Sequence, residues 1–369
     1  MYFRNFHAFR LIAALSVVVL HIELMGVRFG WRSGPLGTNI ESLSLGVDFF
    51  FVLSGFLISS LLMKELDGGG IRIKRFYMRR ALRILPLYYL GVVSVFFIVP
   101  LCGLPPVPGL PLAKDFGLQL GLYSVMAPQV AKSFLSFVPY GGQFWSIGVE
   151  VMYYLLWPLF LIWCPRLSGV VMAIGVCIGI KIASLLVLGA SHPVSAFLAM
   201  SRFEILAIGG AACMIHRLLS AKPESCAPWH RLVVIAGRVF SHKGLWLTCF
   251  GGLVAATVVS WIWLDNAVHL VAGCLFAYLL VGSSQGLICP KIAEHRVVLF
   301  LGEISYGIYL WHFIAIGIIQ TLFTRLGLES DQIIIRPLYY IGTIAVTFAI
   351  SSCSYIFLEK PLNDLRHRI

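Results

Sequence analysis

The chain has 369 residues, of which 59% are hydrophobic and only 12% are charged. Its mean hydropathy is +0.90. Soluble domains carry about 25% charged residues, so this composition excludes a soluble globular protein and indicates an integral membrane protein. The net charge of +12 would suggest a nucleic-acid partner in a soluble chain. Here most basic residues lie between apolar runs, where membrane topology explains them, so we expect no nucleic-acid partner.

Apolar runs of membrane-spanning length follow one another along the chain. A helix that crosses a bilayer needs about 20 mostly apolar residues. The runs lie at 9–25, 43–63, 84–101, 145–163, 169–189, 196–216, 245–263, 267–289, 298–320 and 333–357. We therefore expect an all-α polytopic membrane protein of about ten helices around a central polar cavity, forming a single domain over residues 1–369. The Pro- and Gly-rich stretch 102–144 predicts mainly loop, with a short interfacial helix at 116–127.

The distribution of basic residues predicts the orientation of the chain. Most of the 28 lysines and arginines fall on one side if the N-terminus is inside, which places both termini in the cytoplasm. The first apolar run resembles a signal peptide, but no small-residue cleavage site follows it, so we expect a retained first helix. Nine cysteines without a C-x-x-C pair indicate neither a disulfide framework nor a zinc site, and we expect no bound metal.

The first predicted helix carries Arg10 near its start and His21 within its apolar run. Eleven residues return a helix to within about 20° of the same face and raise it by about 16 Å. One stripe of this helix would thus join an arginine at one membrane surface to a histidine deep in the bilayer. An ionisable side chain at that depth marks a functional site by default. The alternative is an arginine that extends to the membrane surface and a histidine that bonds to a neighbouring helix.

Further ionisable side chains on other predicted helices reach a similar depth. Counting about 1.5 Å per residue places them about 18–22 Å from the inner surface. Together with His21 they are Asp48, Glu150, Lys181, Arg202, Glu204 and His312. A common depth favours one shared polar site over isolated charges that are satisfied separately. Helical spacing adds Ser146 beside Glu150 and Tyr309 beside His312, whereas Lys181 receives no role.

A second cluster is basic and lies before the third predicted span, in the segment KRFYMRRALRILP, which we expect to form an inner loop. Such segments are often basic only because they face the cytoplasm or anionic lipid headgroups. However, Arg79, Arg80 and Arg83 lie close together, and the guanidinium fork suits phosphate groups. With Arg10 they would form an anion-binding mouth below the polar layer.

These motifs, in their order along the chain, resemble acyltransferase family 3 of membrane proteins. Arg10 with His21 matches the family's R-x10-H element, and Arg80 with Arg83 matches its R-x-x-R element. The segments GVDFFFVLSGFLIS, FWSIGVEVMYYLLWP, SRFEILAIGG, ISYGIYLWH and FLEKPL resemble further family segments. Met152 departs from the polar residue that many members carry after the glutamate. The resemblance covers nearly the whole chain.

The resemblance implies an O-acyltransferase of the bacterial inner membrane that takes a short acyl group, acetyl being favoured, from cytoplasmic acyl-CoA. The acceptor would be a hydroxyl of a carbohydrate, such as O-antigen, exopolysaccharide or a lipid-linked glycan, or another hydroxyl acceptor. No permanently bound cofactor is implied. Some members carry a fused extracytoplasmic SGNH domain, which is not recognisable here, so a separate transfer partner stays open.

The residues fit these roles. His21 is the natural general base for the acceptor hydroxyl, and Glu150 would orient it. A covalent acyl-histidine and direct transfer both stay open. Tyr309 or His312 would stabilise the oxyanion. The assigned residues are, for catalysis, His21, Glu150 and Arg10; for acyl-CoA, Arg10, Arg79, Arg80 and Arg83; and for the supporting polar layer, Asp48, Ser146, Arg202, Glu204, Tyr309 and His312.

Two other classes of protein compete with the enzyme. A secondary transporter or flippase for a polar or lipid-linked sugar would also use a buried polar layer, although no inverted repeat is visible. A structural subunit that binds lipid-linked sugar is the third. Only the enzyme consumes acyl-CoA, so that observation separates the three.

Overall fold

The computed structural model describes residues 5–31, 37–108, 115–135, 138–220, 265–284, 291–328 and 334–366. Within these residues all regular secondary structure is helical, which confirms the predicted all-α class. Eight of the helices are long and apolar enough to cross a membrane, and a shorter apolar helix covers Val268–Ser284. The predicted span at 245–263 lies outside the described residues. The number of spans and the side on which the termini lie therefore stay predictions.

The chain divides into two compact units. Unit 1 consists of Met1–Ala13, Leu45–Arg72 and Met152–Leu299, and unit 2 consists of Ala14–Ser44, Ile73–Val151 and Phe300–Ile369. Three helices are shared between them, namely α1 (Asn5–Arg28), α7 (Phe144–Trp163) and α14 (Arg296–Glu303). Unit 1 also contains α2 (Leu45–Asp67), α8 (Leu167–Leu188), α9 (Pro193–Ser201), α10 (Phe203–Ser220), α13 (Asp265–Ser284) and η4 (Lys291–Glu294). Unit 2 also contains η1 (Gly37–Ser44), α3 (Ile73–Val93), η2 (Ser94–Ile98), α4 (Val99–Leu101), α5 (Phe116–Ser124), α6 (Pro128–Phe134), α15 (Ser305–Arg325), α16 (Ile335–Ser354), η5 (Tyr355–Glu359) and α17 (Lys360–Arg366).

The core of unit 1 forms where α2 packs against α10 through glycines. A Cβ atom added to Gly55 would lie 1.9 Å from the carbonyl oxygen of Leu206, and one added to Gly209 would lie 2.1 Å from that of Val52. Only glycine allows the two backbones to approach this closely. Small residues at helix contacts are the usual solution in membranes, where apolar side chains gain little by leaving lipid for a helix contact.

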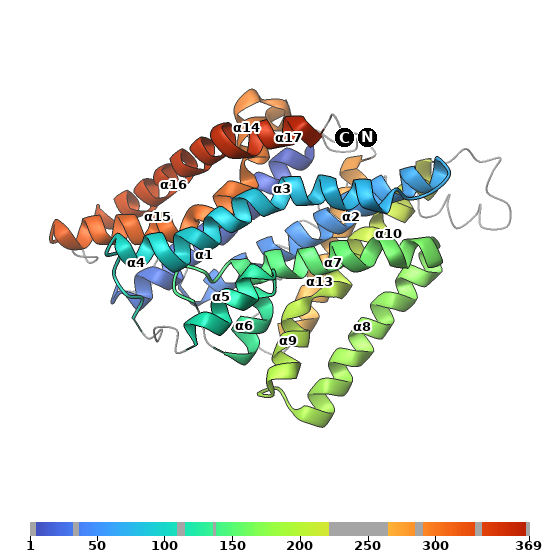
Figure 1. Ribbon diagram of the computed structural model, residues 1–369, viewed down its shortest axis with the longest axis horizontal. Helices are drawn as coiled ribbons and strands as arrows, with labels where there is room; N and C mark the ends of the chain where they lie inside the picture. The colour runs from blue at the N-terminus through green and yellow to red at the C-terminus, as the bar shows by residue number, and fades with distance from the viewer. Residues whose placement is uncertain are drawn as a thin grey trace. The chain divides into compact units, whose positions relative to one another are not determined.

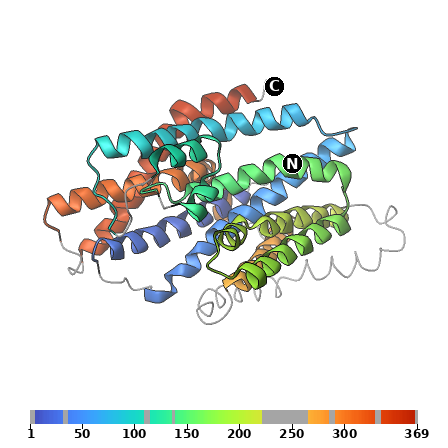
Figure 2. The same cartoon turned by 60° about the horizontal axis from the view of Figure 1, so that its bottom comes forward.

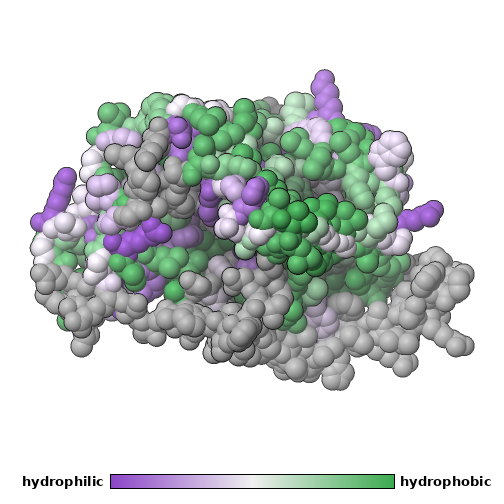
Figure 3. All heavy atoms as spheres, turned by 90° about the horizontal axis from the view of Figure 1, so that it is seen from below, coloured by the Kyte–Doolittle hydropathy of each residue, from purple (hydrophilic) through white to green (hydrophobic). Residues whose placement is uncertain are grey.

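Helix α8 runs beside α10 in unit 1 (Figures 1 and 2) and presents large apolar side chains to the surroundings. The exposed residues are Val171, Met172, Val176, Ile180, Ile182, Leu186 and Val187. Figure 3 shows apolar side chains gathered over this part of the surface. A face of this kind is unfavourable in water and suits lipid, in keeping with an integral membrane protein.

In unit 2, α15 and α16 lie side by side (Figures 1 and 2). Gly307 provides the close approach, because a Cβ atom there would lie 3.2 Å from the Cβ of Ser351. The indole Nε1 of Trp311 donates a hydrogen bond to Ser354 Oγ over 3.1 Å. These contacts fix the rotation of α15, and therefore the direction in which its polar side chains point.

The connection between α4 and α7 contains the short helices α5 and α6, and α5 confirms the predicted short helix at 116–127. Tyr123 donates to the carbonyl oxygen of Gly141 over 3.1 Å, and Tyr140 donates to that of Pro105 over 2.7 Å. Burial raises the pKa of Tyr140 to about 12, so its hydroxyl stays protonated at neutral pH and serves as a donor.

Three local structures differ from the sequence predictions. The basic segment is not a loop, because α3 begins at Ile73 and continues through Pro86; Arg, Met, Ala and Leu in that segment favour helix. The span predicted at 196–216 is broken at Arg202, which adopts a left-handed conformation with φ of 45° between α9 and α10. The span predicted at 298–320 is broken at Ile304, between α14 and α15.

Candidate functional site

The centre of the candidate site is a pair of histidines in unit 2. His21 comes from α1 and His312 from α15, and Nδ1 of His21 lies 3.0 Å from Nε2 of His312. The ring centroids are 4.9 Å apart and the planes differ by 26°. Phe313 packs against both rings, with its centroid 4.5 Å from that of His21 and 4.6 Å from that of His312. Thus two predicted site residues, 291 positions apart, form one hydrogen-bonded pair.

A second contact of the site joins α15 to α7. The Tyr309 hydroxyl lies 2.6 Å from Ser146 Oγ, and the Ser146 hydroxyl donates to the carbonyl oxygen of Gln143 over 3.1 Å. The Gln143 side-chain amide donates to the carbonyl oxygen of Leu310 over 2.7 Å. Ser146 and Tyr309, both predicted site residues, are therefore in direct contact, and they anchor α7 to the turn of α15 that precedes His312.

Glu150 lies one helical turn beyond Ser146 on α7, which places both residues on the same face. Glu150, Arg83 and Glu359 all lie within electrostatic reach of the half-buried Tyr306, whose hydroxyl donates to the carbonyl oxygen of Ile84 over 3.2 Å. Glu359 sits in the π-helical turn η5, and π-helical turns are frequent at functional sites. The predicted pairing of Glu150 with His21 stays a prediction.

Polar side chains of α15 thus follow one another at intervals of three residues. Tyr306, Tyr309 and His312 rise by about 1.5 Å per residue, so the first and last Cα atoms are about 9 Å apart along the axis. We call these three residues the α15 polar line. In unit 2 it connects the neighbourhood of Arg83 and Glu150 to the histidine pair.

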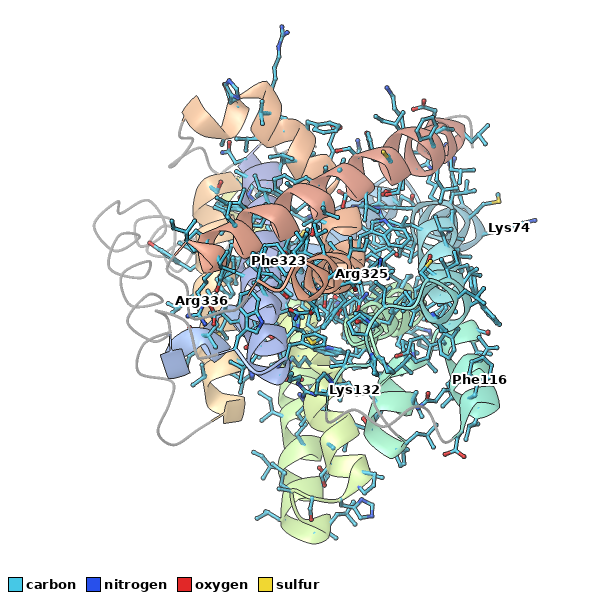
Figure 4. All side chains as sticks on the ribbon, turned by 90° about the vertical axis from the view of Figure 1, so that its left-hand side faces the viewer. Lys74, Phe116, Lys132, Phe323, Arg325 and Arg336 are labelled. Atoms are coloured by element: carbon cyan, nitrogen blue, oxygen red, sulfur yellow. The ribbon has the colours of Figure 1, made fainter. Side chains whose placement is uncertain are left out.

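The predicted acyl-CoA arginines Arg79, Arg80 and Arg83 lie on the first half of α3 and are half-buried. Among the described residues, the Nε atoms of Arg75 and Arg79 are buried and make no hydrogen bond. By contrast, Lys74 is exposed and points away from the helices (Figure 4). Buried guanidinium donors with unused capacity suit an anion that is not part of the chain.

Arg10, the remaining predicted site residue of α1, is half-buried and lies on the same helix as His21. It belongs to unit 1, whereas the arginines of α3 belong to unit 2. The mouth that these residues would form together stays a prediction.

The end of unit 2 that is predicted to face outside also carries cations. Figure 4 shows Arg325 near the end of α15, Arg336 at the start of α16, and Lys132 of α6. The ammonium group of Lys132 lies 4.9 Å from the ring centroid of Trp145, at cation–π distance. Lys132 also lies within electrostatic reach of His21.

Unit 1 contains a separate network of charged residues. Arg202 donates to Asp48 Oδ1 over 2.8 Å, and Nδ1 of His269 lies 2.5 Å from Asp48 Oδ2. The guanidinium also contacts Nε2 of His269 at 3.0 Å. Asp48 is completely buried. These contacts hold Arg202 in its left-handed conformation, which costs about 1–2 kcal/mol for a residue other than glycine.

The second ion pair of unit 1 joins Lys181 of α8 to Glu204 of α10 over 2.5 Å. It gives Lys181, which has no assigned role in the sequence, a structural partner. His269 was missed by the sequence analysis, although it stands inside a predicted span, and an ionisable residue within a span is the signal that could have found it.

The amino-acid sequence is similar to those of known proteins. A family model described as an acyltransferase domain matches residues 3–355. A Staphylococcus aureus (strain COL) protein named provisionally as an O-acetyltransferase is 26% identical over 98% of this chain and 57% of its own length. The peptidoglycan O-acetyltransferase OatA of Listeria monocytogenes is 25% identical over 98% of this chain and 56% of its own length.

A Bacillus subtilis (strain 168) protein, YrhL, named provisionally as a peptidoglycan O-acetyltransferase, is 25% identical over 98% of this chain and 55% of its own length. The chain therefore spans little more than half the length of these relatives. No solved structure matches it.

Proposed function

The chain belongs to the family of the acyltransferase domain, and on that premise we propose that it is a membrane O-acyltransferase of the bacterial inner membrane. It moves a short acyl group, acetyl in the first instance, from cytoplasmic acyl-CoA to a hydroxyl of a carbohydrate. Two relatives are named for O-acetylation of peptidoglycan. An acceptor of the cell envelope, such as peptidoglycan or a lipid-linked glycan, is therefore the first to test.

The observation that carries the proposal is the histidine pair within an apolar helix core. His21 takes the proton of the acceptor hydroxyl, and the oxygen attacks the thioester carbonyl. The carbon–sulfur bond then breaks, an ester forms, and the proton passes to the departing CoA thiolate. The reaction needs no further reactant, because thioester and alcohol give ester and thiol. Pairing with His312 at 3.0 Å supports this role, since a general base must be held in place by a second group.

Arg79, Arg80 and Arg83 bind the phosphates of CoA, a role supported by the unused Nε donor of Arg79. The uncharged pantetheine arm then follows the α15 polar line toward His21. Glu150 lies beside that path and polarises the reacting groups, and Tyr309, whose hydroxyl contacts Ser146, lies three residues before His312. Lys132, Arg325 and Arg336 at the opposite end favour an acceptor that carries negative charge.

The proposal is tested with the purified full chain in lipid nanodiscs. The assay supplies acetyl-CoA with soluble peptidoglycan fragments or neutral oligosaccharides, and it measures both free CoA thiol and acetylated sugar by mass spectrometry. We expect CoA release that depends on the acceptor and disappears in His21→Ala but persists in the matched control His295→Ala, which changes an exposed histidine. Mass spectrometry of envelope glycans with and without the gene would identify the acceptor. Failure to consume any acyl-CoA would instead favour a transporter or a structural subunit.

A further inference from the structure

We infer that His312 is a positioning residue that sets the tautomer of His21, so that Nε2 of His21 carries the lone pair that faces the acceptor. The contacts behind this inference involve the protein alone. Its consequence for acyl transfer rests on the proposed function, and the test below separates the two.

The chain of hydrogen bonds that leads to His21 begins at a backbone carbonyl group. Nδ1 of His312 lies 2.7 Å from the carbonyl oxygen of Tyr309, three residues earlier on α15. A carbonyl oxygen only accepts hydrogen bonds, so Nδ1 of His312 carries a proton. The helix itself supplies this acceptor, which means that the tautomer of His312 does not depend on any distant side chain.

The next step follows from the burial of His312. The side chain is completely buried, and a second ring proton would make it a buried cation, which is strongly disfavoured without a paired anion. The described hydrogen bonds of His312 are to backbone carbonyl groups and to His21. The ring is therefore neutral, and its Nε2 is an acceptor.

The 3.0 Å contact between the rings then fixes the proton of His21. Because Nε2 of His312 accepts, Nδ1 of His21 must be the donor. The two rings are roughly parallel, with planes that differ by 26° and centroids 4.9 Å apart. Neutral His21 has one ring proton, which is on Nδ1, and its Nε2 is left as an unprotonated base.

This arrangement places a neutral imidazole where a catalytic triad uses a carboxylate. In an apolar surrounding a neutral acceptor avoids the cost of a buried anion. When His21 takes a proton from the acceptor, the bond from its Nδ1 to His312 becomes charge-assisted and stronger, which stabilises the transition state more than the ground state. His312 therefore acts through His21 and does not touch the substrate.

Two amide substitutions distinguish the role of Nε2 of His312 from that of Nδ1. The terminal amide of His312→Gln reaches the position of Nε2 and offers an oxygen to Nδ1 of His21. The shorter His312→Asn reproduces only the Nδ1 end and keeps the bond to the carbonyl oxygen of Tyr309. We expect kcat to stay within about tenfold of the wild type in the Gln variant and to fall about 10²-fold or more in the Asn variant, with KM for acetyl-CoA unchanged in both.

A purely structural role predicts the opposite order, because the Asn variant keeps the anchor within α15. Thermal unfolding in detergent establishes that both variants are folded. Equal kcat in the Gln and Asn variants, or a higher kcat in the Asn variant, would overturn the inference.

A spectroscopic measurement decides the tautomer without any assay of activity. Solid-state NMR of the full chain in lipid, labelled at the ring nitrogens of histidine, distinguishes protonated from unprotonated nitrogens; the signals of His21 are those lost in His21→Ala. We expect a protonated Nδ1 and an unprotonated Nε2 in the wild type and in His312→Gln, and a mixture in His312→Asn. A protonated Nε2 on His21 in the wild type would overturn the inference. Absence of acyl transfer with the expected tautomer would overturn the proposed function alone.

Discussion

Unit 1 holds two ion pairs whose carboxylates are buried, whereas His21 in unit 2 is hydrogen-bonded to another histidine. Asp48 has two partners in Arg202 and His269, and Lys181 is paired with Glu204. His21 has a described side-chain partner at Nδ1 only. Ion pairs of this kind join side chains from different helices and so hold those helices together. The lone pair that we infer on Nε2 of His21 is therefore available for chemistry.

We therefore expect substitutions in the two units to affect different properties of the protein. Changes in unit 1 should lower the free energy of unfolding, and changes in unit 2 should lower the rate of reaction in a folded protein.

The largest expected effect is on turnover in unit 2. His21→Ala should reduce acyl transfer by up to about 10⁴-fold, because the general base is removed. The lost bond to buried His312 should cost about 1–3 kcal/mol of stability, and we expect the variant to stay folded in detergent. Acetyl-CoA turnover and thermal unfolding are measured on the same preparation. Retained turnover in a folded His21→Ala protein would refute the catalytic role.

The next effect is on stability in unit 1. Asp48→Asn leaves Arg202 without its buried counter-ion and should lower the free energy of unfolding by about 3–5 kcal/mol. The matched control is Asp67→Asn, which breaks an exposed pair with Arg217 and should cost less than about 1 kcal/mol. Chemical denaturation in detergent compares the two. A similar loss in both variants would mean that the buried network does not hold α2, α10 and α13 together.

Glu150→Gln tests whether Glu150 acts near the reacting groups. The substitution keeps the size of the side chain and removes its charge. We expect turnover to fall by about 10²-fold with KM for acetyl-CoA nearly unchanged, because Glu150 lies one turn from Ser146 and acts near the reacting groups. If the only defect is a higher KM, Glu150 belongs with Arg83 and Tyr306 to the donor path instead.

The smallest expected effect concerns the donor site on α3. Replacing both Arg79 and Arg83 with Ala should raise KM for acetyl-CoA by about tenfold and make it less sensitive to salt, because phosphate contacts are lost. Lysine at both positions should rescue only in part, since it lacks the bidentate fork. Lys74→Ala, which removes an exposed cation of the same helix, is the control and should leave KM unchanged. An unchanged KM in the double variant would reduce the cluster to a topology signal.

Residue pattern alone was enough to predict the membrane class, the helical fold and most spans, because hydropathy and helical period are local properties of the chain. Depth counting also selected His21 and His312, and helical spacing added Ser146 and Tyr309; the structure joins these four residues in two pairs. The acidic and basic residues Asp48, Arg202, Lys181 and Glu204 came from the same counting, and all four are paired in unit 1.

Only the tertiary structure decided which polar groups meet. Partners such as His21 and His312, or Asp48 and His269, are more than 200 residues apart, and their contact depends on how each helix is rotated. The helix break at Arg202 is likewise a tertiary effect. Nothing local forces a left-handed arginine, and it is the bonds from its guanidinium group to Asp48 and His269 that offset the strain. Local sequence sets where helices form, whereas hydrogen bonds between distant helices set where each proton resides.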